Sequence, residues 1–305
     1  MDRYDLCLAW NWEYDADFAA ILEAACSARG LSLWQVTPVN LASALETLSS
    51  AGSVFSVLLD RASEADPNFV PLVEWTISQN VFEINAHKRA VHAVNKATMH
   101  LEFITAGIHT PHTIILPPHS MQPDVSPLDL SPLGEKFIVK PAHGGGGEGV
   151  VLEVSTYAQV LAARQAYPQD YYLLQTHITP VYLAGRPAWF RVIFCGGKIY
   201  PFWWDTTTHV YSLVEEEERR YFGLEPVAST TLDIAQVCGL DLFSTEIALT
   251  ASGLFVVVDY VNNPIDLRLK SAAQDGVPDA VVLGIAAGLA DIALEHRTPL
   301  LPLTQ

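Results

Sequence analysis

The chain has few basic side chains for its length. Its 305 residues include 17 lysines and arginines against 34 aspartates and glutamates, which gives a formal net charge of −17 at pH 7. Proteins that bind nucleic acid or anionic membrane surfaces need local positive charge, so this balance argues against both kinds of partner. Any anionic ligand has to be held by a small number of well-placed cations.

Long hydrophobic runs are also missing, although half of the residues are hydrophobic. No apolar segment approaches the ~20 residues that a membrane-spanning helix needs. The N-terminus lacks a basic segment followed by an apolar one, so we expect no signal peptide. Length and composition together predict a globular, cytoplasmic protein of two or three compact units.

Cysteine and histidine show none of the spacings that are typical of metal sites. The four cysteines are Cys7, Cys26, Cys195 and Cys238. They are scattered along the chain, and we expect reduced, mostly buried thiols in a cytosolic protein. The ten histidines contain no pair of the type H-x-x-x-H. A zinc enzyme is therefore not the first expectation.

Residues 1–92 predict alternating strands and helices. Apolar strands are expected at residues 4–10, 31–36, 54–59 and 81–84. Such alternation is typical of a parallel sheet that is covered on both faces, whose ligands lie at the carboxyl ends of the strands. Arg61 falls at such an end. It either anchors a substrate carboxylate or phosphate, or is a surface arginine that pairs with Asp60 or Glu64.

The segment 137–152 carries two apolar runs around Lys140 and a glycine-rich loop. The glycines of this loop are Gly144, Gly145, Gly146, Gly147 and Gly149. The pattern predicts two strands joined by a loop in which positive φ and the absence of Cβ atoms let backbone N–H groups surround a ligand. Such a nest, with a lysine on the incoming strand, suits the phosphates of a nucleotide. The alternative is a flexible hairpin tip without a ligand.

Two acidic residues, Glu246 and Asp259, lie inside apolar strands. A hairpin that turns symmetrically about its central Ser-Gly places the two carboxylates opposite each other, about 4.5–5.5 Å apart, where like charges repel. Buried charges are costly unless they are paired or bound to metal. A Mg²⁺ ion between them removes this cost, and Asn262 adds a neutral oxygen. The alternatives are solvated acids on an edge hairpin, or neutralisation by Arg191 or Arg268.

Taken in order, these segments resemble the ATP-grasp superfamily, in the style of its RimK/glutathione-synthetase-like branch. The resemblance covers about residues 93–270. It begins with the N-K-A-T and G-I-H-T-P-H-T segments between residues 95 and 113. It continues through the Lys140 strand and its glycine loop, a hinge-like strand that ends at Gln175, and the strand that carries Arg191.

The resemblance implies an α/β fold that is α+β in its ATP-binding part. This is an ATP-grasp fold preceded by an N-terminal parallel α/β domain. The implied boundaries are residues 1–92 for the N-terminal domain, 93–175 for the small lid subdomain, and 176–305 for the C-terminal subdomain.

The resemblance also implies ATP and Mg²⁺ as cofactors. The residues that it implies for ATP binding are Lys96, Lys140, Gly144, Gly145, Gly146, Gly147, Gly149 and Gln175. The implied metal ligands are Glu246, Asp259 and Asn262. The implied catalytic residues are Arg191, at the γ-phosphate, and Arg268, which orients the acceptor carboxylate. For Arg268, a salt bridge to Asp266 or Asp275 is an equal alternative.

One departure concerns the last metal motif, which in the family has an acid and an asparagine separated by one residue. Here Asp259 and Asn262 are separated by two residues. Either Asn262 or Asn263 is then the ligand, or the strand contains a bulge.

The activity that the resemblance implies is that of an ATP- and magnesium-dependent ligase. Such an enzyme activates a carboxylate as an acyl phosphate, which an amine or thiol then attacks. The expected partners are a small-molecule or peptide carboxylate and an amine or thiol donor. Two alternatives stay open: a small-molecule kinase of the same fold, and a nucleotide-binding or scaffold protein whose catalysis has decayed. A homodimer is compatible with the sequence, which does not fix the oligomeric state.

Overall fold

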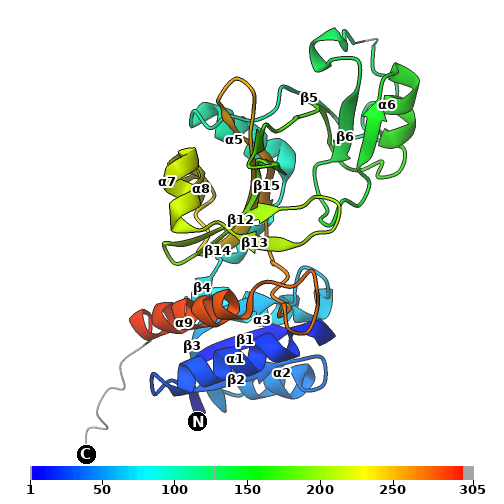
Figure 1. Cartoon of the computed structure of the whole chain (residues 1–305). Helices are drawn as coiled ribbons and strands as arrows, with labels where there is room; N and C mark the ends of the chain where they lie inside the picture. Colours follow the sequence, from blue (N-terminus) through cyan, green and yellow to red (C-terminus); the bar gives the residue numbers. More distant parts are fainter. Residues whose placement is uncertain (1, 127, 298–305) are drawn as a thin grey trace, which may run out of the picture.

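The computed structural model describes residues 2–126 and 128–297. Figure 1 shows an N-terminal sheet with its helices at the bottom, a central sheet above it, and a smaller lid sheet at the upper right. Within the described residues, no helix has the length and apolar character that a crossing of the bilayer requires. The four cysteines are buried and unpaired, in agreement with the expectation from their spacing.

The N-terminal sheet is parallel, as the alternating pattern predicts. Its strands are ordered β2-β1-β3-β4. Their bounds are β1 Asp2–Trp10, β2 Leu33–Val36, β3 Ser53–Arg61 and β4 Phe82–Ile84. The helices of this region are η1 Glu13–Asp15, α1 Ala16–Ser27, α2 Leu41–Ser49, η2 Pro67–Phe69 and α3 Val70–Ser78. Side chains alternate between the two faces of β1, so Leu6 and Leu8 join one apolar core while Cys7 joins another. Arg61 is the last residue of β3 and therefore lies at the carboxyl edge of the sheet.

The central sheet is antiparallel and has the order β13-β12-β11-β14-β15. Its strands are β11 Trp189–Cys195, β12 Lys198–Trp204, β13 Tyr211–Leu213, β14 Leu242–Leu249 and β15 Phe255–Asn262. The helices beside it are α4 His87–Ala93, α5 Lys96–Thr105, α7 Glu216–Phe222 and α8 Glu225–Cys238. Phe103 of α5 and Ile234 of α8 share one buried core with Phe243 of β14, so these two helices cover one face, while Ile193 on the other face joins the core of the N-terminal sheet.

The lid sheet has the order β5-β8-β6-β7 and a small core of its own. Its elements are β5 Thr113–Leu116, η3 Ser131–Leu133, β6 Phe137–Pro141, β7 Val151–Val154, α6 Tyr157–Arg164 and β8 Tyr172–Thr176. Strands β6 and β7 are antiparallel and are joined by the glycine loop, as predicted. A short ribbon, β9 Tyr182–Leu183 with β10 Arg186–Pro187, follows.

The final helix, α9 Asp279–Glu295, returns to the N-terminal sheet (Figure 1). Ile285 and Leu289 of α9 lie in the same buried core as Leu6 and Phe18. The side chain of Arg29 donates to Asp291 at 2.6 Å. The first and last parts of the described chain therefore share one apolar core.

Candidate functional site

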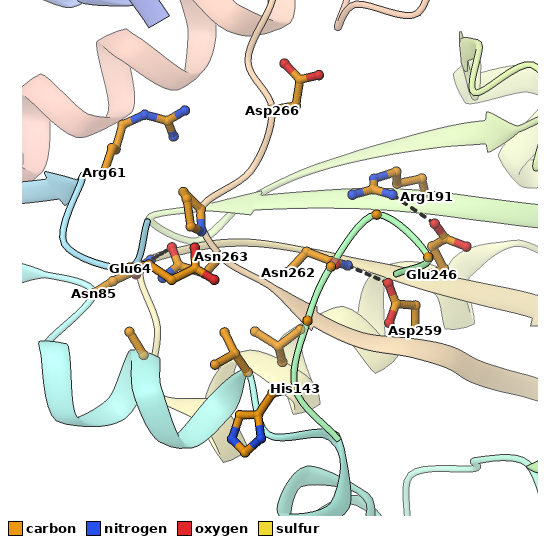
Figure 2. Close-up of a pocket in the computed structure, with 18 of the residues that line it drawn as sticks. Arg61, Glu64, Asn85, His143, Arg191, Glu246, Asp259, Asn262, Asn263 and Asp266 are labelled. Atoms are coloured by element: carbon orange, nitrogen blue, oxygen red, sulfur yellow. Dashed lines mark hydrogen bonds and ion pairs between the residues drawn. The ribbon is translucent and has the colours of Figure 1, made fainter. Parts of the chain in front are cut away.

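A cavity of about 770 Å³ lies between the three sheets and collects most of the predicted site residues. Those on its lining are Lys96, Gly144, Gly145, Gly146, Gly147, Arg191, Glu246, Asp259, Asn262 and Arg268. Figure 2 shows the glycine loop passing in front of Arg191, Glu246 and Asp259. Lys140, Gly149 and Gln175 lie outside this lining.

The two acids are paired across the β14–β15 hairpin. Glu246 lies opposite Asp259, as predicted. The predicted reason is incomplete, because nearer the turn the ladder pairs Ile247 with Val257. One extra residue, Val258, shifts the register by one position, and without this bulge Glu246 would face Val258 instead of Asp259.

A second register shift brings Asn262 to the same acid. Ser244 pairs with Asn262, so three steps along β15 match two steps along β14. In a regular strand, residues three apart point to opposite faces. Because of the extra residue, Asn262 Nδ2 donates instead to Asp259 Oδ2 at 2.9 Å (Figure 2). The bulge that the sequence offered as one alternative is present. It places Asn262 beside Asp259 although two residues separate them in the sequence.

The neighbouring Asn263 has a different partner. Its Oδ1 accepts from Asn85 Nδ2 at 2.7 Å, and Asn85 Oδ1 in turn accepts from the backbone N–H groups of Asp241 and Leu242. Asn263 thus belongs to a network that joins β4 to the start of β14. Of the two candidate asparagines, Asn262 is the one that lies against Asp259.

The carbonyl groups released by the two bulges have partners. Val258 O accepts from Lys140 Nζ at 3.1 Å, and Asp259 O accepts from Thr245 Oγ1 at 2.9 Å. Buried carbonyls need such partners because an unsatisfied one costs free energy. The Lys140 ammonium also lies 5.3 Å from the centre of the Tyr260 ring. Lys140 is therefore fixed on β15, behind the acid pair.

Burial lowers the pKa of Lys140 to about 8. The nearby Asp259 opposes this shift, whereas Lys96 adds to it. Burial also acts to raise the pKa of Asp259, but Lys140, Lys96 and the Asn262 hydrogen bond outweigh it, so the pKa of Asp259 is lowered. The lysines keep this carboxylate ionised within a buried setting.

Glu246 is held by two donors. Arg191 Nη1 donates to Glu246 Oε1 at 2.8 Å, and Trp189 Nε1 donates to Oε2 at 2.9 Å. Burial raises the pKa of Glu246, against the opposing effect of Arg191. The predicted alternative, in which an arginine neutralises the acid pair, is thus present for Glu246. Arg191 Nε is buried and has no partner among the described residues.

The oxygen atoms of this group fit a hard divalent cation. Glu246, Asp259 and Asn262 offer two carboxylates and one amide on one face of the sheet. No cluster of three or more His, Cys, Asp or Glu suited to a metal occurs in residues 2–126 and 128–297. A cation here would therefore keep positions for water or phosphate oxygens, which is the usual environment of Mg²⁺.

The glycine loop is tied to the start of α5. Lys96 Nζ donates to the carbonyl oxygen of Gly144, and the backbone N–H of Lys96 donates to Ala142 O at 2.8 Å. Gly144, Gly146 and Gly147 have φ of +96°, +60° and +80°, which glycine adopts without strain. These backbone angles let the loop curve over the acid pair.

Gly149 and Gln175 have partners within the protein. A Cβ atom at Gly149 would come within 2.6 Å of the Tyr167 ring, so this glycine permits close packing. Gln175 Nε2 donates to Thr113 Oγ1 at 3.0 Å and to Tyr260 Oη at 2.7 Å. The ligand-binding roles of Gly149 and Gln175 stay predictions.

Arg268 makes both of the salt bridges that the sequence offered as alternatives. Its Nη2 donates to Asp266 at 2.7 Å and to Asp275 at 2.9 Å, while the residue lines the cavity. The interpretation of Arg61 as a surface arginine is wrong. Arg61 is buried and donates to Asp15 through Nε at 3.0 Å and Nη2 at 2.6 Å. Neither Asp60 nor Glu64 is its partner.

Part of the lining was not anticipated from the sequence. Helix α4 contributes His87, Ala90 and Val91 to the cavity wall. This helix has only seven residues and no side-chain cap, so neither hydrophobic periodicity nor a capping motif predicts it from the sequence. The segment around Thr206 and His209, after β12, also reaches the cavity. This segment can be recognised as part of the lining only from its position in the folded structure.

No protein-family profile and no curated protein matches the chain. Solved structures do match it. A RimK-domain ATP-grasp protein from Sphaerobacter thermophilus is 20% identical, with a TM-score of 0.63 over 94% of this chain and 98% of that chain. D-alanine–D-alanine ligase from Bacillus anthracis, complexed with ATP, is 14% identical, with a TM-score of 0.64 over 97% of both chains. The ATP-grasp ligase PsnB, complexed with minimal precursor, Mg and ADP, is 13% identical, with a TM-score of 0.60 over 96% of this chain and 98% of that chain. These matches include the N-terminal sheet as well as the central and lid sheets, and they confirm the predicted architecture: the chain has the ATP-grasp fold.

Proposed function

We propose that this protein is an ATP- and magnesium-dependent ligase that activates a carboxylate as an acyl phosphate for attack by an amine or thiol. One observation carries the proposal. Two bulges in β15 set Asp259 opposite Glu246 and beside Asn262, under the glycine loop and in a single cavity. An edge hairpin without a ligand would have no need for buried acids in this arrangement.

The acid pair and Asn262 would hold Mg²⁺, which when bound neutralises charge on phosphate oxygens. Lys96 and Arg191, which both line the cavity, would orient the phosphates. Arg191 suits this role because its planar fork matches phosphate geometry and its Nε has no partner among the described residues. Lys140 would contribute its charge from behind the acids.

The glycine loop would act as a lid over the reacting groups. Gly144 to Gly147 line the cavity above the acid pair. An acyl phosphate is hydrolysed readily, so a loop that excludes water protects it until the nucleophile attacks. Catalysis then rests on positioning and charge neutralisation.

The solved neighbours support ATP and Mg²⁺ as cofactors, since their complexes include ATP in one case and Mg with ADP in another. They also suit a small-molecule or peptide carboxylate substrate with an amine or thiol donor. A cytoplasmic location and a homodimer belong to the same proposal. The alternative of decayed catalysis was suggested by the unusual spacing after Asp259, and the bulge accommodates this spacing, which favours the ligase.

A hydroxylamine trap separates a ligase from a kinase. Hydroxylamine attacks acyl phosphates and gives hydroxamates, which iron(III) detects by colour. With MgATP, hydroxylamine and separate panels of carboxylic acids and of alcohols, we expect ADP and hydroxamate in equal amounts from the wild type with a carboxylic acid. Asp259→Asn should reduce both by about 100-fold or more. ADP release with a phosphorylated alcohol and no hydroxamate would instead establish the kinase.

A further inference from the structure

The cavity has a second end, away from the acid pair, which we call the acceptor end. Its charged lining residues are Asp60, Arg61, Glu64, Asp266, Arg268 and Asp275. They come from the carboxyl end of β3 and from the segment that follows β15. Figure 2 shows Arg61 and Glu64 on the side of the view opposite Arg191, Glu246 and Asp259.

The acceptor end is acidic, and its arginines are already paired. Arg268 is shared between Asp266 and Asp275, and Arg61 is paired with Asp15. With Asp15 included, which pairs with Arg61 behind the lining, five carboxylates lie near two guanidinium groups and the Lys96 ammonium, an excess of two negative charges. Lys96, the remaining cation on this side of the glycine loop, donates to Gly144 O. A cationic ligand group is therefore favoured here over an anionic one.

Glu64 is the acid best placed to meet such a group. Asp60 already accepts from the backbone N–H groups of Ala62 and Ser63. Glu64 lines the cavity with its side chain partly exposed, and it has no hydrogen bond or ion pair within the described part of the chain. Burial and Asp60 raise the pKa of Glu64, although Lys96 acts in the opposite direction. A nearby ammonium group would oppose this shift, because it attracts the ionised carboxylate.

Arg61 offers a second, independent contact. Its side chain is 3% exposed, and its Nη1 is buried with no partner in residues 2–126 and 128–297. The other donors are used, since Nε and Nη2 bond to Asp15 and Nη2 also bonds to Ile265 O at 3.0 Å. A buried N–H group without a partner is costly, so an oxygen atom is expected against Nη1. Because Asp15 neutralises the guanidinium, a carbonyl oxygen suits Nη1 better than a further carboxylate.

We propose that the acceptor end binds an aminoacyl group, in which an ammonium lies next to a carbonyl oxygen. Glu64 faces the ammonium, and Arg61 Nη1 donates to the carbonyl. The chemical class is that of α-amino amides, as at the N-terminus of a peptide. The proposal rests on the proposed function only in treating this end of the cavity as the place of the second substrate.

Binding without nucleotide tests the proposal directly. Calorimetry of the full chain would use the amides of the twenty standard amino acids, the free amino acids, and the N-acetylated amides, which keep the carbonyl but lose the charge. We expect at least one amide to bind, and its N-acetylated form to bind at least tenfold more weakly. Free amino acids, in which a carboxylate replaces the amide carbonyl, should bind more weakly than the amides, and equally tight binding would overturn the carbonyl contact to Arg61.

Two variants locate the contacts. Glu64→Gln should weaken the tightest amide at least tenfold, whereas Glu74→Gln, an exposed glutamate of α3 outside the cavity, should change its affinity by less than twofold. Arg61→Lys keeps the charge beside Asp15 but loses Nη1, and it should also weaken the amide at least tenfold. If Arg61→Lys does not fold, the affinity of Glu64→Gln for the amide is sufficient to test the proposal.

The same proteins also report on the nucleotide half of the cavity. Glu64→Gln should leave the affinity for a non-hydrolysable ATP analogue unchanged. Amide binding without nucleotide binding would remove the proposed function and leave this inference standing. Absence of amide binding, equal binding of the N-acetylated forms, or an unchanged affinity in Glu64→Gln would overturn it.

Discussion

Two adjacent asparagines, Asn262 and Asn263, have different partners in this structure. Both line the cavity, but Asn262 donates to Asp259, while Asn263 accepts from Asn85. A sequence motif gives no preference between them. The difference in their hydrogen bonds predicts a difference in the effect of their removal.

We expect Asn262→Ala to weaken magnesium-dependent binding of an ATP analogue about tenfold, or about 1.4 kcal/mol, with little effect on stability. Asn263→Ala should instead lower the free energy of unfolding by about 1–2 kcal/mol, because the Asn85 amide loses a partner. Calorimetric titration and urea denaturation measure the two quantities. Similar effects of both variants on ligand binding would contradict this division of roles.

Lys140 gives a prediction about pH. Its pKa is lowered to about 8 by burial, so in the folded protein the side chain is charged below about pH 8 and neutral above it. A neutral amine attracts phosphates less than an ammonium does. The affinity for the ATP analogue should therefore fall as the pH rises from about 7 to about 9.5, by up to about tenfold per unit above the pKa.

Lys140→Arg provides the control for this titration, because arginine stays charged over the whole range. The affinity of this variant should be nearly independent of pH between about 7 and 9.5. The same loss of affinity in Lys140→Arg as in the wild type would show that another group causes the pH dependence.

At the scale of elements, strand β15 decides the geometry of the site. Its two bulges are held by a hydrogen bond from Lys140 to Val258 O and by one from Thr245 to Asp259 O. Lys140 belongs to β6 of the lid sheet, and Thr245 belongs to β14, which pairs with β15. The position of the acid in the cavity therefore depends on side chains that do not themselves line it.

Thr245→Val tests this dependence. Valine keeps the shape of the buried side chain but loses the hydroxyl donor to Asp259 O. We expect the free energy of unfolding to fall by about 1–3 kcal/mol and magnesium-dependent binding to weaken. Thr245→Ser, which keeps the hydroxyl, should retain binding. Equal loss in both variants would point to packing instead of the hydrogen bond.

Regular elements were predictable from the sequence, and irregular ones were not. Short apolar runs predicted β1, β3 and the hairpin on either side of the glycine loop, and in β1 and β3 such runs reflect burial on both faces of the sheet. The bulges of β15 gave no such indication, since Val258, Tyr260 and Val261 are ordinary strand residues. Helix α4 lacked both length and a cap.

The candidate site shows the same division. The acid pair was predicted from spacing along one hairpin, which is a local feature. The Arg61–Asp15 pair was not, because it joins the end of β3 to the start of α1, 46 positions apart in the sequence. Contacts of this kind depend on the path of the segments that connect the parallel strands. Local sequence patterns do not specify that path.

On the scale of the whole molecule, α9 joins the two ends of the described chain. Its buried face packs with Leu6 and Phe18 of the N-terminal region and with Ile193 of the central sheet. The boundary predicted at residues 92–93 is thus crossed by a continuous apolar core. We expect the N-terminal and central sheets to unfold together.

Leu289→Ala should lower the free energy of unfolding by about 2–5 kcal/mol, because Leu289 is fully buried in this shared core. Leu294→Ala, on the same helix but 42% exposed, should cost less than about 1 kcal/mol. Amide hydrogen exchange in denaturant, followed in β1 and in β11, should show one coincident transition in both variants. Separate transitions for the two strands would refute a single cooperative unit.

The proposed activity requires that the cavity bind magnesium and ATP. Calorimetric titration of the protein with a non-hydrolysable ATP analogue, with and without Mg²⁺, tests it most directly, beside Glu246→Ala and Asp259→Asn. We predict binding that requires Mg²⁺ and weakens at least tenfold in both variants. Absence of binding to the folded wild type, or binding that neither Mg²⁺ nor the two substitutions affect, would contradict the proposed function.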